Sequence, residues 1–297
     1  MLNKALVLGG SGQVGKLLVD SLRATGIQTT VVDSRPPNPN TSDGPFLQTD
    51  ISNSEPALTS AIRHADCVCV CLPEKIALDA AGNLAGAMPG GALWLDTLSV
   101  KRDIVHLLQR RTRDIEILSL NPMFAPALGW PGNTVAAVEA APGPKSALFK
   151  QLLASWGARV EMLTAVEHDQ FTAAIQVATH AAVLSFGAAL LGTGYDLKKA
   201  LRLSTPPHRL LLTLLHRIVT QNADVYWDIQ AYHPLGTEMR NELIRALESI
   251  QSAVDKDEAT PFTALFAELR SLLAPSGETL ADWTKRCFEQ LKLTADR

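Results

Sequence analysis

The feature that most constrains this chain is a glycine-rich turn close to its N-terminus. An apolar run at residues 5–8 leads into Gly10, Gly12 and Gly15, which have the spacing G-x-G-x-x-G and precede an amphipathic segment. The first glycine of such a pattern allows a tight turn, the second leaves room for a pyrophosphate, and the third lets the helix pack close to the strand. Backbone N–H groups at the start of that helix then face the phosphates. The pattern predicts a dinucleotide-binding strand, turn and helix.

An acidic residue follows at the distance expected for an adenosine ribose. Asp33 lies eighteen residues after Gly15 and ends a second apolar run at residues 29–33. A carboxylate there accepts both ribose hydroxyls and repels a 2′-phosphate, which favours NAD over NADP. Arg35 leaves the second cofactor open, because its guanidinium can stack on adenine or attract a phosphate. The predicted cofactor contacts are Gly10, Ser11, Gly12, Gln13, Val14, Gly15, Asp33, Ser34, Arg35, Leu72 and Pro73.

Length and composition exclude several classes of protein. With 297 residues, 46% of them hydrophobic and 19% charged, the chain can form two globular domains with cores. The formal net charge of -3 is spread without a basic stripe, so we expect no nucleic-acid partner and no anionic membrane partner. No signal peptide is visible, and no apolar run reaches the roughly 20 residues of a membrane-spanning helix. We therefore expect a cytoplasmic protein.

The cysteines and most histidines do not form a metal-binding pattern. Cys67, Cys69 and Cys71 alternate along one apolar run, so they lie on one face of a buried strand. This spacing fits neither a disulfide framework nor a usual zinc site, which favours reduced thiols in the core. We expect no metal, because five further histidines also lack the spacing of metal ligands: His64, His106, His208, His216 and His233.

The pattern of apolar residues divides the chain into two parts. Up to about residue 165, predicted strands at 29–33, 66–73, 92–96, 115–120, 134–139 and 158–163 alternate with helices, which predicts a doubly wound, mostly parallel α/β sheet. The helices are predicted at 54–63, at 76–87, from about 101 to 111, and before residue 156. Residues 34–50 are rich in Pro, Asn and Asp and are predicted to form a loop over the adenosine end of the cofactor.

From residue 166 onward the pattern is that of helices alone. A long apolar helix at 168–191 carries few charges, which places it between other helices or in a subunit interface. Further helices are predicted near 197–204, 207–221, 224–232, 237–255, 260–273 and 277–292. The predicted domains are therefore a Rossmann domain at 1–165 and an all-α domain at 166–297.

Six separated motifs resemble those of the prephenate dehydrogenase family in order and spacing. They are the glycine turn, Asp96–Lys101, Leu120–Pro126, Val166–Gln170, Gln176–His180 and Leu203–Arg209. The resemblance covers nearly the whole chain. It implies a Rossmann domain, a helical domain that forms a homodimer, and NAD(P)-dependent oxidative decarboxylation of a cyclohexadienyl substrate to a 4-substituted phenylpyruvate.

The resemblance also implies roles for individual residues. Ser99 is similar to the active-site serine of the family, and otherwise it caps the following helix. His180 is similar to a second active-site histidine, although its apolar segment also fits a hydrogen-bonded core residue. Arg209 is similar to the arginine that holds a substrate carboxylate through two parallel hydrogen bonds, and otherwise it is a surface residue at a helix end. Lys101 neutralises the substrate or the cofactor, or is a surface lysine at a helix start.

A pair of neighbouring polar residues begins the long apolar helix. His168 and Asp169 stand where Asp is favoured as a cap or as a partner of the helix dipole. We interpret this pair as structural.

Asn121 departs from the family pattern. The family has the sequence Leu-His-Pro-Met-Phe, in which the histidine bonds the ring hydroxyl and takes its proton as hydride leaves, and this chain has Asn121 in that place. An asparagine is no general base near neutral pH, and loss of such a base typically costs about 10²- to 10⁴-fold in rate. We do not expect an ordinary prephenate dehydrogenase to carry this change.

Three hypotheses account for Asn121. In the first, the substrate is 4-amino-4-deoxyprephenate, whose amine supports hydride loss without a strong base, and the product 4-aminophenylpyruvate serves a 4-aminophenylalanine pathway of secondary metabolism. In the second, the substrate is prephenate or arogenate, and His180 or a water acts as the base. In the third, the chain is an inactive NAD-binding sensor or partner protein. The sequence leaves open the group at C4, strict NAD preference, feedback inhibitors and the pathway.

Overall fold

In the described part of the chain, eight strands form one sheet with the order β3-β2-β1-β4-β5-β6-β7-β8. Neighbouring strands are parallel except for β6 and β7, which are antiparallel. The strands are β1 Lys4–Leu8, β2 Gln28–Asp33, β3 Phe46–Gln48, β4 Cys67–Val70, β5 Leu93–Asp96, β6 Glu116–Pro122, β7 Thr134–Ala141 and β8 Arg159–Met162. The predicted doubly wound, mostly parallel sheet is confirmed.

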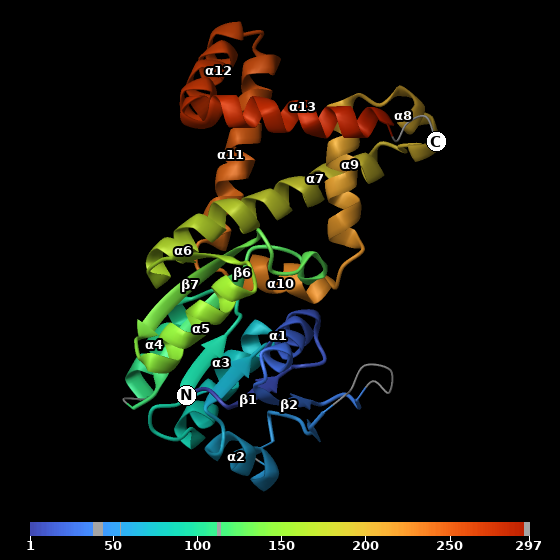
Figure 1. Ribbon diagram of the computed structural model, residues 1–297. Helices are drawn as coiled ribbons and strands as arrows, with labels where there is room; N and C mark the ends of the chain where they lie inside the picture. The colour runs from blue at the N-terminus through green and yellow to red at the C-terminus, as the bar shows by residue number, and fades with distance from the viewer. Residues whose placement is uncertain (38–43, 54, 112–113, 294–297) are drawn as a thin grey trace. The chain divides into compact units, whose positions relative to one another are not determined.

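Helices cover both faces of this sheet (Figure 1). Alternate residues of each strand face opposite sides, so Leu6 and Leu8 of β1 pack in the core under α2, α3 and α4, and Ala5 and Val7 pack in the core under α1 and α5. The helices are α1 Gln13–Ala24, α2 Pro56–Arg63, α3 Glu74–Ala87, α4 Arg102–Arg111, α5 Pro144–Ser155 and α6 Ala165–Thr172. Two separate layers of apolar side chains thus fix the sheet from its two sides.

The computed structural model describes residues 1–37, 44–53, 55–111 and 114–293. They divide into two compact units, here called the sheet unit (1–172 and 231–234) and the helical unit (173–230 and 235 onward). The compact units differ from the predicted division at residue 165, because α6 and the short segment at 231–234 belong with the sheet. The functional division into 1–165 and 166–297 stays a prediction.

One strand lies inside the predicted loop at residues 34–50. β3 pairs in parallel with the end of β2, with Phe46 opposite Val31. Three residues are too few to show the alternation of polar and apolar residues that marks a strand. Residues 38–43 of the predicted loop and residue 54, where a helix was predicted to begin, lie outside the described residues.

The helices predicted after residue 166 are confirmed, with ends shifted by at most three residues. In the helical unit, α9 contacts both α7 and α13, and α11 contacts α12 (Figure 1). The helices are α7 Thr179–Gly192, α8 Leu197–Leu203, α9 Pro206–Val219, α10 Ala223–Tyr232, α11 Gly236–Asp255, α12 Ala259–Leu273 and α13 Gly277–Leu293.

Residues Ala165–Gly192 are helical throughout, with a π-helical stretch at Ala173–Ala178. The helix has a mean hydropathy of 1.6 in its most apolar window, of which 11% is buried. By length and composition it could cross a membrane, so the expectation that no apolar segment reaches this length is wrong. One such helix does not identify a membrane protein, and a poorly buried apolar helix also fits the predicted subunit interface.

The alternating cysteines lie as predicted. Cys67 and Cys69 are fully buried in the core under α1 and α5, with their sulfur atoms 3.6 Å apart, and the partly buried Cys71 packs against the same core. All three are free thiols, and burial raises the pKa of Cys71. Within the described ranges, no three His, Cys, Asp or Glu side chains are placed to hold a metal ion.

Candidate active site

The glycine turn connects β1 to α1, and its left-handed residue is Gly9. Gly9 has φ +74°, and a Cβ there would lie 2.2 Å from the backbone oxygen of Cys71, so only glycine fits. Gly10, to which the sequence pattern gave the tight turn, is the next residue of the same turn, which the bond from Gly12 N–H to Gly9 O closes at 3.0 Å, so the left-handed position lies one residue earlier than the pattern indicated. The pair of glycines at 9 and 10 was the available signal, but the motif spacing begins at the second of them.

The other glycines hold α1 close to the turn and leave its first N–H groups open. A Cβ at Gly15 would lie 2.3 Å from the oxygen of Gly9, which confirms the close packing predicted for the third glycine. Gly12 is the residue before α1, and it has no side chain to cap the helix. No hydrogen bond from the N–H groups of Gln13 and Val14 to a described residue is found. These donors and this space fit a pyrophosphate.

Asp33 ends β2 beside this turn. Its Oδ2 accepts the N–H of Ser11 at 3.1 Å, and its Oδ1 accepts the backbone N–H of Arg35 at 3.0 Å and Arg35 Nε at 3.1 Å. Burial raises the pKa of Asp33, but the bonds from Arg35 and Ser11 outweigh this, so the pKa lies below its ordinary value. The carboxylate is therefore ionised, which fits an acceptor for ribose hydroxyls. Arg35 pairs with this acid, and its side chain is 65% exposed.

The remaining predicted cofactor contacts lie at the same edge of the sheet. Leu72 follows β4, and its Cδ2 is 3.1 Å from the place of a Cβ on Gly9. Pro73 directly precedes α3, and Ser34 directly follows β2. The carboxyl ends of β1, β2 and β4 are neighbours, and this edge is where open α/β sheets bind nucleotides.

Lys101 lies in a closed ionic cluster at the ends of β5 and β6. Its fully buried ammonium donates to Asp96 Oδ1 at 3.2 Å and to the backbone oxygens of Leu98 at 2.7 Å and Leu120 at 2.6 Å. Asp96 also accepts Ser119 Oγ at 2.6 Å. All three donors of the ammonium are thus used inside the protein. Lys101 was predicted to be either a ligand of the substrate or cofactor or a surface lysine, and both predictions are wrong.

Ser99 is half-buried in the loop between β5 and α4, and its N–H donates to Glu74 Oε2 at 3.2 Å. It does not cap α4, because the carboxylate of Asp169 accepts the N–H groups of Lys101 at 2.9 Å and Arg102 at 3.1 Å at the start of that helix. Asp169 was predicted as a cap or dipole partner of its own helix, and its carboxylate binds the first N–H groups of α4. The hydroxyl of Ser99 remains a candidate for the substrate.

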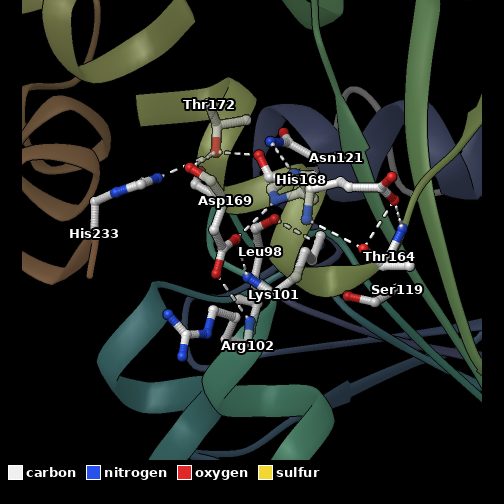
Figure 2. A network of polar contacts seen from close by, with 12 residues as sticks. Leu98, Lys101, Arg102, Ser119, Asn121, Thr164, His168, Asp169, Thr172 and His233 are labelled. Carbon is white, nitrogen blue, oxygen red and sulfur yellow. Dashed lines mark hydrogen bonds and ion pairs between the residues drawn. The ribbon is translucent and has the colours of Figure 1, made fainter. Parts of the chain in front are cut away.

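Asn121 lies inside β6, opposite Ala136 of β7, because the strand runs on to Pro122 and does not end at residue 120 as predicted. Its side chain is buried, and Nδ2 is 3.1 Å from Nε2 of His168. His168 is fully buried on α6, and its Nδ1 is 2.8 Å from Oδ1 of Asp169 (Figure 2). The structure thus places Asn121, His168 and Asp169 in one row.

His168 was not among the residues predicted for the site. The pair His168–Asp169 has the structural role that was predicted, since Asp169 binds the start of α4, but His168 also contacts the candidate catalytic residue. The motif Val166–Gln170 contains this histidine, but a local motif does not show that the imidazole contacts Asn121 of β6. Thr172 Oγ1 donates to the backbone oxygen of His168 at 2.8 Å and lies 3.1 Å from His233 Nε2, which holds this part of α6 (Figure 2).

Burial and the neighbouring charges fix the protonation states in this row. Burial lowers the pKa of His168 below its ordinary value, and Lys101 lowers it further, although the bond to Asp169 opposes both. Burial raises the pKa of Asp169, but the bonds from His168, Lys101 and Arg102 outweigh it, so the pKa is lowered. At neutral pH the row therefore contains an ionised Asp169 and a neutral His168.

His180 and Arg209 belong to the helical unit. The Nδ1 of His180 is buried without a hydrogen-bond partner among the described residues, and the ring packs edge-on against Tyr226 with centroids 4.8 Å apart. Burial lowers the pKa of His180, and Arg217 adds to this effect. The imidazole is thus neutral, and its buried Nδ1 is unpaired among the described residues.

Arg209 is half-buried in the first turn of α9. Its Nε donates to Ser204 Oγ at 2.8 Å and its Nη1 to the backbone oxygen of Leu291 at 3.4 Å. Among the described residues no carboxylate pairs with it, so its charge is available to a carboxylate ligand. The sheet unit contains Ser99 and Asn121, and the helical unit contains His180 and Arg209. That the four residues surround one substrate ring stays a prediction.

Comparison with known proteins decides the family. The chain is 39% identical over 289 residues to the 4-amino-4-deoxyprephenate dehydrogenase of Streptomyces pristinaespiralis, covering 97% of each protein. The chain belongs to the prephenate dehydrogenase family. The family model described as prephenate dehydrogenase, dimerization domain, matches residues 164–268. The T-protein of Enterobacter agglomerans is 29% identical over 230 residues, which are 77% of this chain and 56% of the T-protein.

Solved structures agree with this family in their fold. The prephenate dehydrogenase from A. aeolicus, in complex with hydroxyphenyl propionate and NAD+, has a TM-score of 0.68 and 17% identity, covering 91% of this chain and 96% of that one. The arogenate dehydrogenase of Synechocystis has a TM-score of 0.62 and 16% identity, covering 94% and 99%. Residues 5–82 match the NAD dependent epimerase/dehydratase family. This match and the ionised Asp33 identify the protein as an NAD-dependent dehydrogenase of the prephenate dehydrogenase family.

Proposed function

We propose that this protein catalyses the NAD-dependent oxidative decarboxylation of 4-amino-4-deoxyprephenate to 4-aminophenylpyruvate, a step in making a 4-aminophenylalanine-type metabolite. The observation that carries the proposal is Asn121, a neutral amide in the place where the family resemblance expects a histidine. The 39% identical relative from S. pristinaespiralis, named for this substrate, supports it. The substrate amine supports hydride loss with its own lone pair, so the site needs an acceptor for an N–H and no strong base.

The residues divide the work as follows. Asn121 accepts an N–H of the amine through its carbonyl oxygen, and Arg209 binds a carboxylate of the substrate through two parallel hydrogen bonds. Ser99 and His180 offer polar groups to the ring and its second carboxylate. The glycine turn and Asp33 would hold the NAD, which would supply the acceptor for the hydride of the ring carbon that bears the amine. The C–C bond to the ring carboxylate then breaks, its electron pair completes the aromatic ring, and carbon dioxide leaves, which makes the reaction irreversible.

The direct test compares substrates. Purified protein and NAD are mixed with 4-amino-4-deoxyprephenate, prephenate or arogenate, NADH formation is followed by absorbance, and the product is identified by mass spectrometry. The proposal expects fast turnover of the amino substrate and a kcat/KM at least about 100-fold lower for prephenate, the range over which a missing base acts. Faster turnover of prephenate or arogenate would contradict it and point to His180 as the base. Tight NAD binding without turnover of any substrate would instead favour an inactive sensor.

We propose further that the protein acts as a homodimer formed by the helical domain and works in the cytoplasm. The match to the dimerization-domain model supports the homodimer, and so do the large apolar side chains that the helical unit leaves exposed, which include Leu191, Leu203, Trp227, Leu247, Leu272 and Trp283. Size-exclusion chromatography with light scattering is expected to give twice the 32.0 kDa of one chain. A mass of one chain at micromolar concentration would contradict it.

A further inference from the structure

From this geometry we infer that His168 is a positioning residue: it turns the amide of Asn121 so that its carbonyl oxygen faces the substrate amine, and it thereby sets the preference for an amino substrate. The inference rests on the proposed function and adds to it a residue that never touches the substrate. It follows from the donors and acceptors in the row Asp169, His168 and Asn121.

The row starts from a carboxylate that can only accept. Asp169 takes up the N–H groups of Lys101 and Arg102 at the start of α4, and its low pKa keeps it ionised. The contact of 2.8 Å between Asp169 Oδ1 and His168 Nδ1 must therefore be a bond that the imidazole donates. This requires the proton of a neutral His168 to be on Nδ1.

The tautomer of His168 determines which atom of the Asn121 amide faces it. A neutral imidazole with its proton on Nδ1 has a lone pair on Nε2, and this lone pair accepts only from a donor. The atom of Asn121 that lies 3.1 Å from Nε2 is therefore the amide nitrogen, Nδ2. Of the two orientations of the amide, which differ in shape by almost nothing, His168 stabilises one.

The other polar atom of the amide, Asn121 Oδ1, has no partner of this kind among the described residues. Within the described part of the chain, no residue donates a hydrogen bond to Asn121 Oδ1. The backbone around Asn121 is held by its pairing with Ala136 and by the bond from Lys101 Nζ to the oxygen of Leu120, so the amide turns only about its own side-chain bonds. Asn121 Oδ1 is thus an acceptor that no described residue binds, at the end of a row in which the Asp169 carboxylate and both ring nitrogens of His168 have partners.

This orientation matters for the chemistry of an amine. An oxygen accepts an N–H and leaves the nitrogen lone pair free to support hydride loss. The reversed amide would donate its N–H into that lone pair and withdraw the electrons that the reaction needs. We therefore expect loss of His168 as acceptor to lower kcat for the amino substrate more than it raises KM, because the amide then adopts both orientations.

Two substitutions at one position separate positioning from packing. In His168→Asn, the shorter amide reaches Asp169 as Nδ1 does but leaves Asn121 without its acceptor, whereas His168→Gln keeps a polar atom near the place of Nε2. We expect His168→Asn to lower kcat for 4-amino-4-deoxyprephenate about 10-fold, the value of one hydrogen bond, with little change for prephenate. His168→Gln is expected to recover most of the ratio between the two substrates.

A matched control removes another buried imidazole of the same unit. His233 is buried and contacts Thr172 and the backbone of Asp169, so it tests the rest of the row apart from the bond between His168 and Asn121. His233→Asn is expected to change the stability and to leave the ratio of kcat/KM for the two substrates as it is. If His168→Asn changes this ratio no more than His233→Asn does, the inference is wrong, even where the wild type prefers the amine and the proposed function holds.

A measurement on the wild type does not depend on the folding of any variant. Nitrogen-15 NMR distinguishes a protonated from an unprotonated ring nitrogen. For His168 at neutral pH the inference expects a protonated Nδ1 and an unprotonated Nε2. A proton on Nε2, or on both nitrogens, would turn the amide of Asn121 around and overturn the inference.

Discussion

Two buried polar clusters lie side by side at the carboxyl ends of β5 and β6. In the cluster of Asp96, Lys101 and Ser119, every donor of the ammonium has an acceptor inside the protein. In the row of Asn121, His168 and Asp169, the carboxylate and both ring nitrogens have partners, and Asn121 Oδ1 is bound by no described residue. Both clusters contain ionised groups in the core, and only the second has a group left for a ligand.

The number of unpaired groups distinguishes structural from functional polar residues in such a core. In a closed cluster every group depends on its partners, and losing one partner leaves a buried charge, which destabilises the fold. An open row transmits the orientation of its inner members to the last one. Lys101 looked like a site residue in the sequence and belongs to the closed cluster, whereas His168 looked structural and belongs to the open row.

The largest expected effect is on stability and comes from the closed cluster. Lys101→Met removes the ammonium and leaves Asp96 buried without its cation, which is expected to lower the free energy of unfolding by about 3–5 kcal/mol. Urea unfolding followed by circular dichroism measures this. The matched control is Lys75→Met, which breaks an exposed pair with Asp79 and is expected to cost less than about 0.5 kcal/mol. Equal effects of the two variants would show that the buried cluster is not closed.

A change of pH is expected to have an intermediate effect on the free energy of unfolding. Burial lowers the pKa values of His168, His180 and His233 below the ordinary 6.5, so the unfolded chain binds more protons than the folded one as the pH falls below that value. The contribution of these neutral histidines to the free energy of unfolding is fully present above pH 6.5. It is lost as the pH falls through their lowered pKa values, by at most about 1.4 kcal/mol per pH unit for each histidine. The carboxylates with lowered pKa values affect the free energy of unfolding only at more acidic pH.

His168 of the open row contributes to this pH dependence of the free energy of unfolding. Asp169, Asp96, Lys101 and His233 all influence His168, and the net effect keeps it neutral. His168→Gln removes one titrating group, so its urea midpoint is expected to fall less steeply than that of the wild type between pH 6.5 and about pH 5. Parallel curves for the two proteins would mean that His168 is not held neutral.

The smallest effect is expected from Ser119. Ser119→Ala removes one hydrogen bond to Asp96, which is expected to lower the free energy of unfolding by about 1 kcal/mol. Because Ser119 belongs to the closed cluster, the ratio of kcat/KM for the amino substrate and prephenate is expected to stay unchanged. A shift of this ratio would show that the bond from Ser119 to Asp96 also controls the orientation of Asn121.

Much of the fold followed from local patterns. The glycines, the alternating strands and the charge-poor helices predicted the sheet, its parallel direction and the helical second half, because each of these signals lies within one element. β3 was missed because three residues carry too little periodicity, and the left-handed turn at Gly9 was displaced by one residue. Residues 231–234 return to the sheet unit from far along the chain, which no local signal predicts.

The site was less predictable for a physical reason. Whether Lys101 is exposed or buried depends on the oxygens of Leu98 and Leu120, which are backbone atoms of other segments and leave no mark in the sequence. The same holds for Asp169, whose partners are the N–H groups of α4, 67 and 68 residues away. Asn121 was found because the family resemblance made its departure visible, and its neighbour His168 was not.

The most direct test of the account is the substrate preference of Asn121→His beside the wild type. Initial rates of NADH formation are measured with 4-amino-4-deoxyprephenate and with prephenate at neutral pH. The account predicts that the wild type prefers the amine and that the variant shifts the ratio of kcat/KM toward prephenate by about 100-fold or more, since a base is gained. A wild type that prefers prephenate, or a variant with an unchanged ratio, would contradict the claim that Asn121 selects the substrate.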